Sequence, residues 1–198
     1  MKELTNSILR GNLLADMANH IQMMKPTLEN LKRSQNKPEF KMPVDLGQNS
    51  TIPIAASKIS GEDGGKFGNT RVGQNGAQFH GGLDIKASKN TPVMSSAAGI
   101  VVRAEYSTSY GNVIYINHSG GYQTRYAHLE NISVRKGDLI DAGEMIGKAG
   151  TTGNADFPGV VPHLHFEIRQ LNKWSSAAAL GNSESTPLDP LLFLRTVQ

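Results

Sequence analysis

The segment FHGGLDI places two residues of types that can bind metals, His80 and Asp84, four positions apart. The two glycines between them disfavour a helix, so the segment is predicted to be extended or looped. In an extended chain, residues four apart share a face, and both side chains can point to the same side. The paired glycines would also let the backbone approach a metal or a substrate closely.

The segment PHLHFEIR alternates regularly between polar and apolar residues, as a strand with one buried face does. One face carries His163, His165, Glu167 and Arg169. The Cα atoms of the two histidines would lie about 7 Å apart, given a strand rise of roughly 3.3 Å per residue. One histidine could therefore bind a metal while the other contacts the metal's water or the substrate.

His128 follows Thr124 and Tyr126 at alternate positions, and regular alternation places all three on one strand face. Alone, His128 would be read as structural, as are His20 and His118. The chain contains no cysteine, so a transition-metal site must use histidine, carboxylate or water. Together, the two motifs and the further histidine predict a catalytic zinc site.

From about residue 54, short runs of β-type residues alternate with Gly, Asn or Ser turns, as in β-sandwiches and barrels. The chain is predicted to be mainly β, with an antiparallel β-sandwich or barrel-like catalytic domain and an N-terminal helical segment. A terminal turn that packs hydrophobically is expected at 187–194. The predicted strands are 91–97, 99–106, 112–119, 122–129, 138–142, 144–150 and 163–169.

Three parts are predicted along the chain. Residues 1–34 form a helical segment, because apolar residues recur there at spacings of three and four, with a break at Pro26. Its apolar stripe could dock to its own domain, to a second copy or to a larger assembly. Residues 35–53 contain three prolines and form a linker or arm. Residues 54–198 form the catalytic domain.

The net charge of +3 and the pI of about 9.1 fit ordinary solubility, although an anionic polymer such as cell wall would also be attracted. Aromatic and basic residues do not interleave as in base-stacking proteins, so no nucleic acid is expected. No run approaches the roughly 18 apolar residues of a membrane span. The first 20 residues make a poor secretory signal, because charged residues and Asn interrupt their apolar stretch.

Six segments resemble, in order, the lysostaphin- and LytM-type zinc endopeptidases that act on bacterial cell wall. The resemblance covers about residues 54–195, and its specific part is the His-x-x-x-Asp motif followed by His-x-His. The segments are FGNTR (67–71), FHGGLDI (79–85), TPVMSSAAGIVV (91–102), YGNVIYINHSGGYQTRYAHL (110–129), VRKGDLIDAGEMIGKAGTTG (134–153) and PHLHFEIR (162–169).

The resemblance implies one Zn²⁺ per chain, held by His80, Asp84 and His165, with water as the fourth ligand. It implies that His128 and His163 lie beside that water, one as general base and the other stabilising the oxyanion. Which histidine takes which role stays open. The implied substrates are the stem peptides and cross-bridges of peptidoglycan, hydrolysed at the cell wall in the periplasm or outside the cell.

Further expectations concern the surroundings of the site. Glu167, Tyr126 and Asn112 are candidates to orient the ligands. The stretch NADFPGVV (154–161) is longer than usual in the family and would border the substrate groove, as would the Gly-rich stretch 61–78.

Other readings stay open. A non-catalytic relative could bind cell wall or activate another hydrolase. A lipoyl or biotinyl carrier would share the strand rhythm around Lys148, but it would leave the histidines unexplained. Between glycine bridges and D-alanyl–diaminopimelate links, the second is preferred because it is more widespread. Delivery as a phage component, as a secreted effector or after loss of an export signal stays open, and the arm could lie across the groove.

Overall fold

The computed structural model describes residues 37–45, 64–73, 76–172 and 184–194. These residues form a mainly β structure with a few short 3₁₀ helices. The predicted helical segment 1–34 lies outside the described residues. The strands are β1 (Gly68–Gly73), β2 (Gly76–His80), β3 (Leu83–Lys86), β4 (Pro92–Met94), β5 (Gly99–Ser107), β6 (Gly111–His118), β7 (Tyr122–Ile132), β8 (Leu139–Ile140), β9 (Met145–Ala149), β10 (His163–Leu171) and β11 (Ser185–Leu188).

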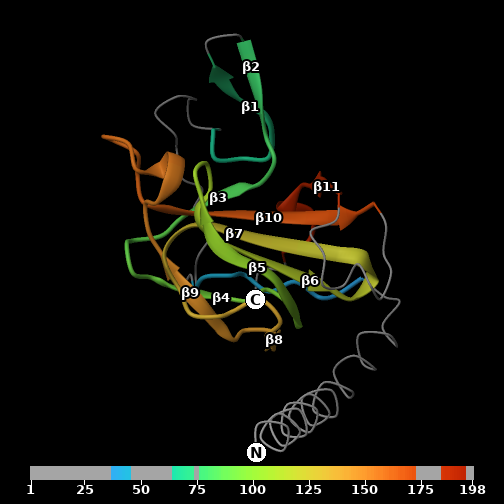
Figure 1. Cartoon of the computed structure of the whole chain (residues 1–198). Coiled ribbons are helices and arrows are strands. Elements are labelled where there is room, and N and C mark those ends of the chain that lie inside the picture. Colours follow the sequence, from blue (N-terminus) through green and yellow to red (C-terminus); the bar gives the residue numbers. More distant parts are fainter. Residues whose placement is uncertain (1–36, 46–63, 74–75, 173–183, 195–198) are drawn as a thin grey trace, which may run out of the picture.

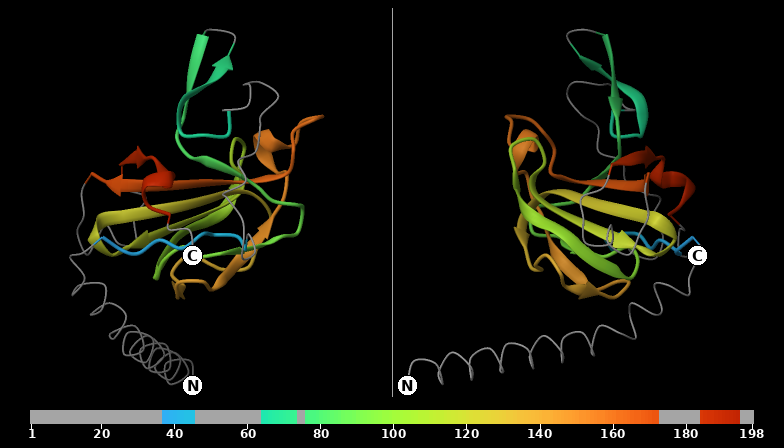
Figure 2. Two further views of the ribbon diagram at one scale, coloured as in Figure 1. Left: turned by 180° about the vertical axis from the view of Figure 1, so that it is seen from behind. Right: turned by 45° about the vertical axis from the view of Figure 1, so that its right-hand side comes forward.

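Nine of these strands form one antiparallel sheet. Six of them lie side by side in the order β11-β10-β7-β6-β5-β8, and the other three are β3, β4 and β9. Strand β3 pairs with β10, while β9 pairs with the end of β7 and with β4. The sheet bends strongly but stays open, as the two views of Figure 2 show. The prediction of a mainly β, antiparallel fold is confirmed, but the sheet does not close into a barrel.

The main core cluster lies on one face of this sheet, because alternate residues of each strand point to opposite sides, and a smaller cluster forms from the alternate residues of β5, β6 and β7. Leu164, Phe166 and Ile168 of β10 are fully buried there, together with Tyr126 of β7. The other face of β10 carries the histidines predicted from the alternation. Lys148 lies within β9, opposite Pro92, rather than at a hairpin tip, which leaves the carrier reading without support.

Residues 37–45, within the predicted arm, pack against the core side of the body. Phe40 and Val44 are 1% and 2% exposed and belong to the main core cluster. The Lys41 amide donates to the Ser96 carbonyl at 2.7 Å, and the Met94 amide donates to Pro43 at 2.8 Å. This segment, blue in Figure 1, therefore lies on the face of the sheet opposite His163 and His165, and not across them.

The hairpin of β1 and β2 is a separate two-stranded sheet that projects from the body (Figure 1). At the other end of the chain, β11 and the 3₁₀ helix Pro190–Leu192 form the predicted terminal turn, and Leu194 is buried against the core. Among the described residues, no helix is long and apolar enough to cross a membrane.

Candidate metal centre

Two neighbouring strands and the hairpin position the predicted ligands. Asp84 of β3 lies directly opposite His165 of β10 in the antiparallel register. Such cross-strand partners bring their Cβ atoms to within about 4.5–5.5 Å. His80 ends β2, so the strand that carries it leads straight into the carboxylate strand. The extended path predicted for FHGGLDI is therefore present, and it puts both side chains on the same side.

Gly82 lets β3 approach the ligand strand this closely. A Cβ atom at this position would lie 2.6 Å from the Phe166 carbonyl oxygen and 2.9 Å from the His165 ring. Contacts this short to backbone are not possible for a real side chain. The close approach expected of the paired glycines is thus an approach to the strand that carries His165.

Three donor atoms converge at the centre. Asp84 Oδ1 lies 2.8 Å from His165 Nδ1 and 3.2 Å from His80 Nε2, and the two ring nitrogens are 3.0 Å apart. All three residues are buried, at 2–6% exposure. Two ligands of a tetrahedral ion with bonds of about 2.0–2.1 Å lie about 3.3 Å apart. The spacing and the donor types therefore suit a small four-coordinate metal ion.

Both predicted ligand histidines are oriented through their second nitrogen. His80 Nδ1 donates to the Lys66 carbonyl at 2.8 Å, which leaves Nε2 free for a metal. His165 turns Nε2 to Glu167 Oε1 at 3.0 Å, which leaves Nδ1 at the centre. Such outer partners fix the tautomer and the ring orientation of metal-binding histidines. The expectation that Glu167 orients a ligand therefore agrees with the geometry.

Glu167 is itself held by several donors, although it is only 1% exposed. Tyr110 Oη donates to Oε1 at 2.7 Å, and Arg169 donates to Oε2 at 2.6 Å. Arg125 lies 3.7 Å from the same oxygen, Oε2. Burial alone would raise the pKa of Glu167, but the hydrogen bond and charge of His165, followed by the charge of Arg125 and the hydrogen bond of Tyr110, lower it to about 2.

His128 reaches the centre by an irregularity in β7, which the sequence does not reveal. The ladder between β6 and β7 shifts register next to His128, and the residue has a φ of 60°, in the left-handed region. The prediction that His128 shares a face with Thr124 and Tyr126 is therefore wrong. Those two face the core side, where Tyr126 Oη accepts from the Ser96 amide, while the bulge turns His128 toward His163 and His165.

The loop after β9 fixes His128 and His163, the two histidines predicted to lie beside the metal-bound water. His128 Nδ1 donates to the Thr152 carbonyl, and His163 Nδ1 donates to the Val161 carbonyl, each at 2.8 Å. The long stretch 154–161 lies between these two carbonyls, so it borders the site as expected. In both rings Nε2 is left as an acceptor. The ring centroids of His128 and His163 lie 5.1 Å apart.

The electrostatics separate the predicted ligand His165 from the two other histidines. Burial, together with the neighbouring histidines, lowers the pKa of His128 to about 3, and burial also lowers the pKa of His163. For His165, hydrogen bonds to Asp84 and Glu167 outweigh burial and raise the pKa to about 9. A metal ion at Nδ1 would compete with that proton. His128 and His163 are neutral bases at neutral pH.

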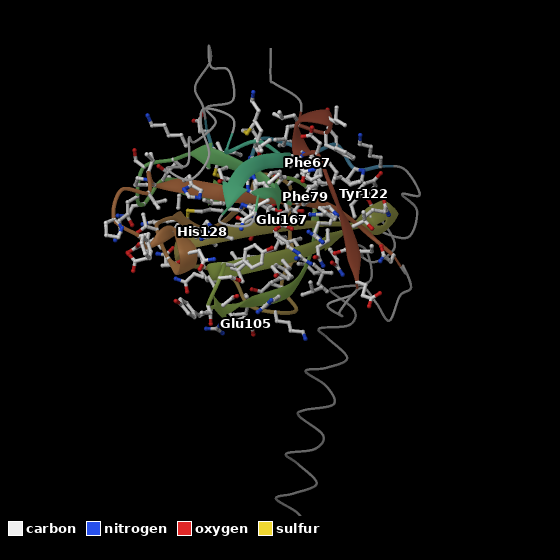
Figure 3. The ribbon with its side chains drawn as sticks, turned by 90° about the horizontal axis from the view of Figure 1, so that it is seen from above. Phe67, Phe79, Glu105, Tyr122, His128 and Glu167 are labelled. Carbon is white, nitrogen blue, oxygen red and sulfur yellow. The ribbon has the colours of Figure 1, made fainter. Side chains whose placement is uncertain are left out.

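Tyr126 and Asn112, the other two candidates to orient the ligands, lie in different places. Tyr126 is remote from the centre, on the core face. Asn112 donates to the carbonyls of Leu129 and Glu130, directly after His128, so it acts on the backbone of the bulge. Figure 3 looks down on the site face, with His128 and Glu167 labelled within it, Phe79 on β2 of the projecting hairpin and Phe67 just before β1.

Sequence reasoning missed two contributors, Tyr110 and Arg71. Tyr110 supports Glu167, and burial with the adjacent carboxylate raises its pKa above the ordinary range. Arg71 binds Asp84 and ends the segment FGNTR, which the family resemblance included without a role.

The model of peptidase family M23 matches residues 78–183, which is more than half of the chain. The chain belongs to peptidase family M23. The matched residues of this M23 chain include all five predicted site residues, and the predicted resemblance to lysostaphin-type enzymes is confirmed.

Named relatives of the M23 chain are larger proteins. It is 39% identical to the peptidoglycan DD-endopeptidase ShyA of Vibrio cholerae over 89 residues, which are 45% of this chain and 20% of ShyA. It is 35% identical to the cell division protein DipM of Caulobacter vibrioides over 118 residues, 59% of this chain and 18% of DipM. The chain thus spans about a fifth of the length of these curated relatives.

Solved structures agree on the M23 fold. The catalytic domain of lysostaphin from Staphylococcus simulans superposes with a TM-score of 0.53 at 32% identity, covering 65% of this chain and 87% of that domain. A chain of the SpoIIQ–SpoIIIAH pore-forming complex superposes with a TM-score of 0.55 at 26% identity, covering 80% of this chain and 92% of the other.

Proposed function

We propose that this chain is a zinc-dependent endopeptidase that hydrolyses peptide cross-links of bacterial peptidoglycan. In this proposal His80, Asp84 and His165 hold one Zn²⁺, and His128 and His163 act on the water and the substrate. The observation that carries it is the convergence of three buried donors within 3.2 Å of one another, beside two neutral histidines. Membership of peptidase family M23 gives this geometry a chemical context.

The donor set favours zinc over harder ions. Two imidazoles and one carboxylate form a three-ligand set of the kind found in catalytic zinc sites, which keep one position for water. Calcium and magnesium prefer sites built from oxygen. When bound, zinc would lower the pKa of its water toward roughly 7 and polarise the scissile carbonyl.

The protein's own groups supply the remaining steps. His128 and His163 each donate Nδ1–H to a backbone carbonyl, so each presents Nε2 as a proton acceptor. Because their pKa values are lowered, both are neutral at pH 7. One can take a proton from the attacking water and pass it to the leaving amine. The other can stabilise the charge that develops on the carbonyl oxygen once a proton taken up at Nε2 makes it a donor there.

The proposed substrate is a D-alanyl–diaminopimelate cross-link, with action at the cell wall. The relatives include DD-endopeptidases of peptidoglycan, such as ShyA, which supports this link over a glycine bridge. Lysostaphin is described as an antimicrobial peptidase, and its catalytic domain shares the fold, so the glycine-bridge alternative is tested alongside.

The test combines metal analysis with digestion of two defined wall types. The purified chain is loaded with zinc, and metal is measured per chain after removal of free ions. Cross-linked peptidoglycan with direct diaminopimelate links and peptidoglycan with glycine bridges are then digested separately. We expect one zinc per chain and, from the first wall type, products with a new diaminopimelate amino terminus in mass spectra.

The possible outcomes distinguish the proposed enzyme from a non-catalytic relative, and they also test the substrate and the role of the metal. One zinc per chain without any new amino terminus would refute the enzyme proposal and favour a member that binds cell wall or activates another hydrolase. New glycine amino termini would keep the enzyme and change the substrate. Activity that survives complete zinc removal would refute the metal's role.

A further inference from the structure

The guanidinium of Arg71 lies against two of the three metal donors. Its Nη2 makes a hydrogen-bonded ion pair with Asp84 Oδ2 and lies 3.0 Å from His80 Nε2. Its Nε donates to the Gly64 carbonyl at 3.0 Å. The side chain is therefore held between the backbone and the ligand carboxylate. A strand irregularity directs it there, because the β1–β2 register shifts between Gly68 and Arg71.

The two oxygens of Asp84 have different partners. Oδ1 faces the ligand nitrogens of His80 and His165, at 3.2 and 2.8 Å. Oδ2 faces Arg71, and His163 Nε2 is 3.8 Å from it. A carboxylate can bind a metal through one oxygen or through both. Here the second oxygen already has a charged donor, so it is kept from the metal.

The two contacts of Arg71 differ in whether a metal would displace them. The contact with His80 uses Nε2, since Nδ1 is occupied by the Lys66 carbonyl. A metal bound to Nε2 takes the lone pair that this contact needs. The contact with Asp84 uses Oδ2, whereas Oδ1 is the oxygen that faces the two ring nitrogens, so a metal bound through Oδ1 would leave Oδ2 available to Arg71.

We propose that Arg71 is a positioning residue that makes Asp84 a one-oxygen ligand. By holding Oδ2, it limits the protein to three donor atoms and keeps the fourth tetrahedral position for water or substrate. This inference rests on the proposed metal site, and it extends the site to the projecting hairpin. Without Arg71, Asp84 can turn and bind through both oxygens, which raises the coordination number and blocks the open position.

Cobalt substitution provides a readout that does not depend on catalysis. Co²⁺ replaces zinc in the full-length chain, and its visible absorption is more intense in four-coordinate sites than in five- or six-coordinate ones. We expect Arg71→Met to bind one Co²⁺ per chain with a clear loss of band intensity. In the zinc form, kcat/KM should fall by roughly 10–100-fold, the effect typical of an outer-shell partner.

Two further variants complete the design. Arg71→Lys keeps one cationic donor for Oδ2, so it should recover most of the band intensity. Arg135→Met is the matched control, because Arg135 is exposed on the turn before β8, and its spectrum and activity should equal those of the wild type.

Cobalt bands of equal shape and intensity in wild type and Arg71→Met would overturn the role of Arg71 while leaving the metal site intact. A wild-type chain that binds neither cobalt nor zinc would instead refute the proposed function, and this inference with it. If Arg71→Met does not fold, the comparison of Arg71→Lys with the wild type tests the proposed role of Arg71. A fourfold or greater loss of turnover by Arg71→Lys, with an unchanged band, would also overturn the proposal.

Discussion

Two regions of the sheet bury a histidine almost completely, yet they give it opposite chemistry. At one end of β6, His118 is fully buried, with Nδ1 2.9 Å from the Ala98 carbonyl and Nε2 2.7 Å from Thr124 Oγ1. Burial lowers its pKa to about 4. At the metal centre, His165 is 6% exposed, and two carboxylates raise its pKa to about 9 against the effect of burial.

The charge of the partners, and not the depth of burial, separates the two regions. Within the described part of the chain, the partners of His118 are neutral and include the ring of Phe40 at 5.6 Å, so it acts as a neutral connector between strands. His165 lies between Asp84 and Glu167, which favour a positive charge at its ring. A metal ion can supply that charge. A buried histidine therefore indicates a site when carboxylates converge on it.

Replacing His165 by alanine and replacing His118 by alanine should give the largest difference in zinc affinity. His165→Ala takes away one of three ligands, so zinc affinity should fall by more than the roughly 100-fold typical of outer-shell changes, and hydrolysis should be lost. His118→Ala should bind one zinc per chain with unchanged affinity. Chelator competition measures both. Equal zinc affinity in the two variants would remove the distinction between the regions.

The non-ligand histidines should affect turnover without affecting the metal. His128→Ala and His163→Ala should each keep one zinc per chain and lower kcat by roughly 10²–10⁴-fold, the usual contribution of a general acid or base. Metal content and steady-state hydrolysis of a cross-linked peptide provide the measurements. Full activity in either variant would show that its assigned role is wrong.

Glu167→Gln should weaken the metal centre while leaving its three ligands in place. The neutral amide keeps an oxygen for His165 Nε2 but removes the negative charge, so zinc affinity should fall by roughly 10–100-fold. Glu105→Gln is the matched control, because Glu105 is 60% exposed on β5 and pairs with Arg103. If both variants bind zinc equally well, the carboxylate beside His165 does not tune the metal.

His118 should affect neither metal binding nor turnover, and its replacement should change only how stability depends on pH. Its folded pKa of about 4 lies below the unfolded value of about 6.5, so the unfolded chain binds the extra proton between these values. The free energy of unfolding should therefore fall as pH drops through this window, by up to about 1.4 kcal/mol per pH unit. His118→Asn, which can still donate to Ala98, should reduce this slope. Urea unfolding from pH 7 to pH 4.5 measures it, and an unchanged slope would contradict the assignment.

The sequence predicted those features that depend on local periodicity. Alternation in PHLHFEIR placed His163 and His165 on one face, and the glycines of FHGGLDI indicated an extended approach. The seven predicted strands correspond to β4–β10. Each of these predictions needs only the two-residue period of a strand and the conformational preferences of glycine.

Features that depend on irregular backbone were not predictable. A single bulge moves His128 from the core face to the site face, and a register shift in β1 directs Arg71 to Asp84. Neither leaves a periodic signal. Likewise, two apolar side chains in a polar, proline-containing stretch did not predict that residues 37–45 pack into the core.

That packing decides where the chain can be shortened. A fragment that begins at residue 53 would lack Phe40 and Val44, and replacing one buried Phe by Ala already costs about 3–5 kcal/mol. The free energy of unfolding of a whole domain is only about 5–15 kcal/mol. A change in activity after such a cut would thus report partial unfolding, whereas a cut just before Lys37 keeps Phe40 and Val44 in the chain. Residues 37–45, offered as a free peptide, should rebind to the shorter fragment and restore it.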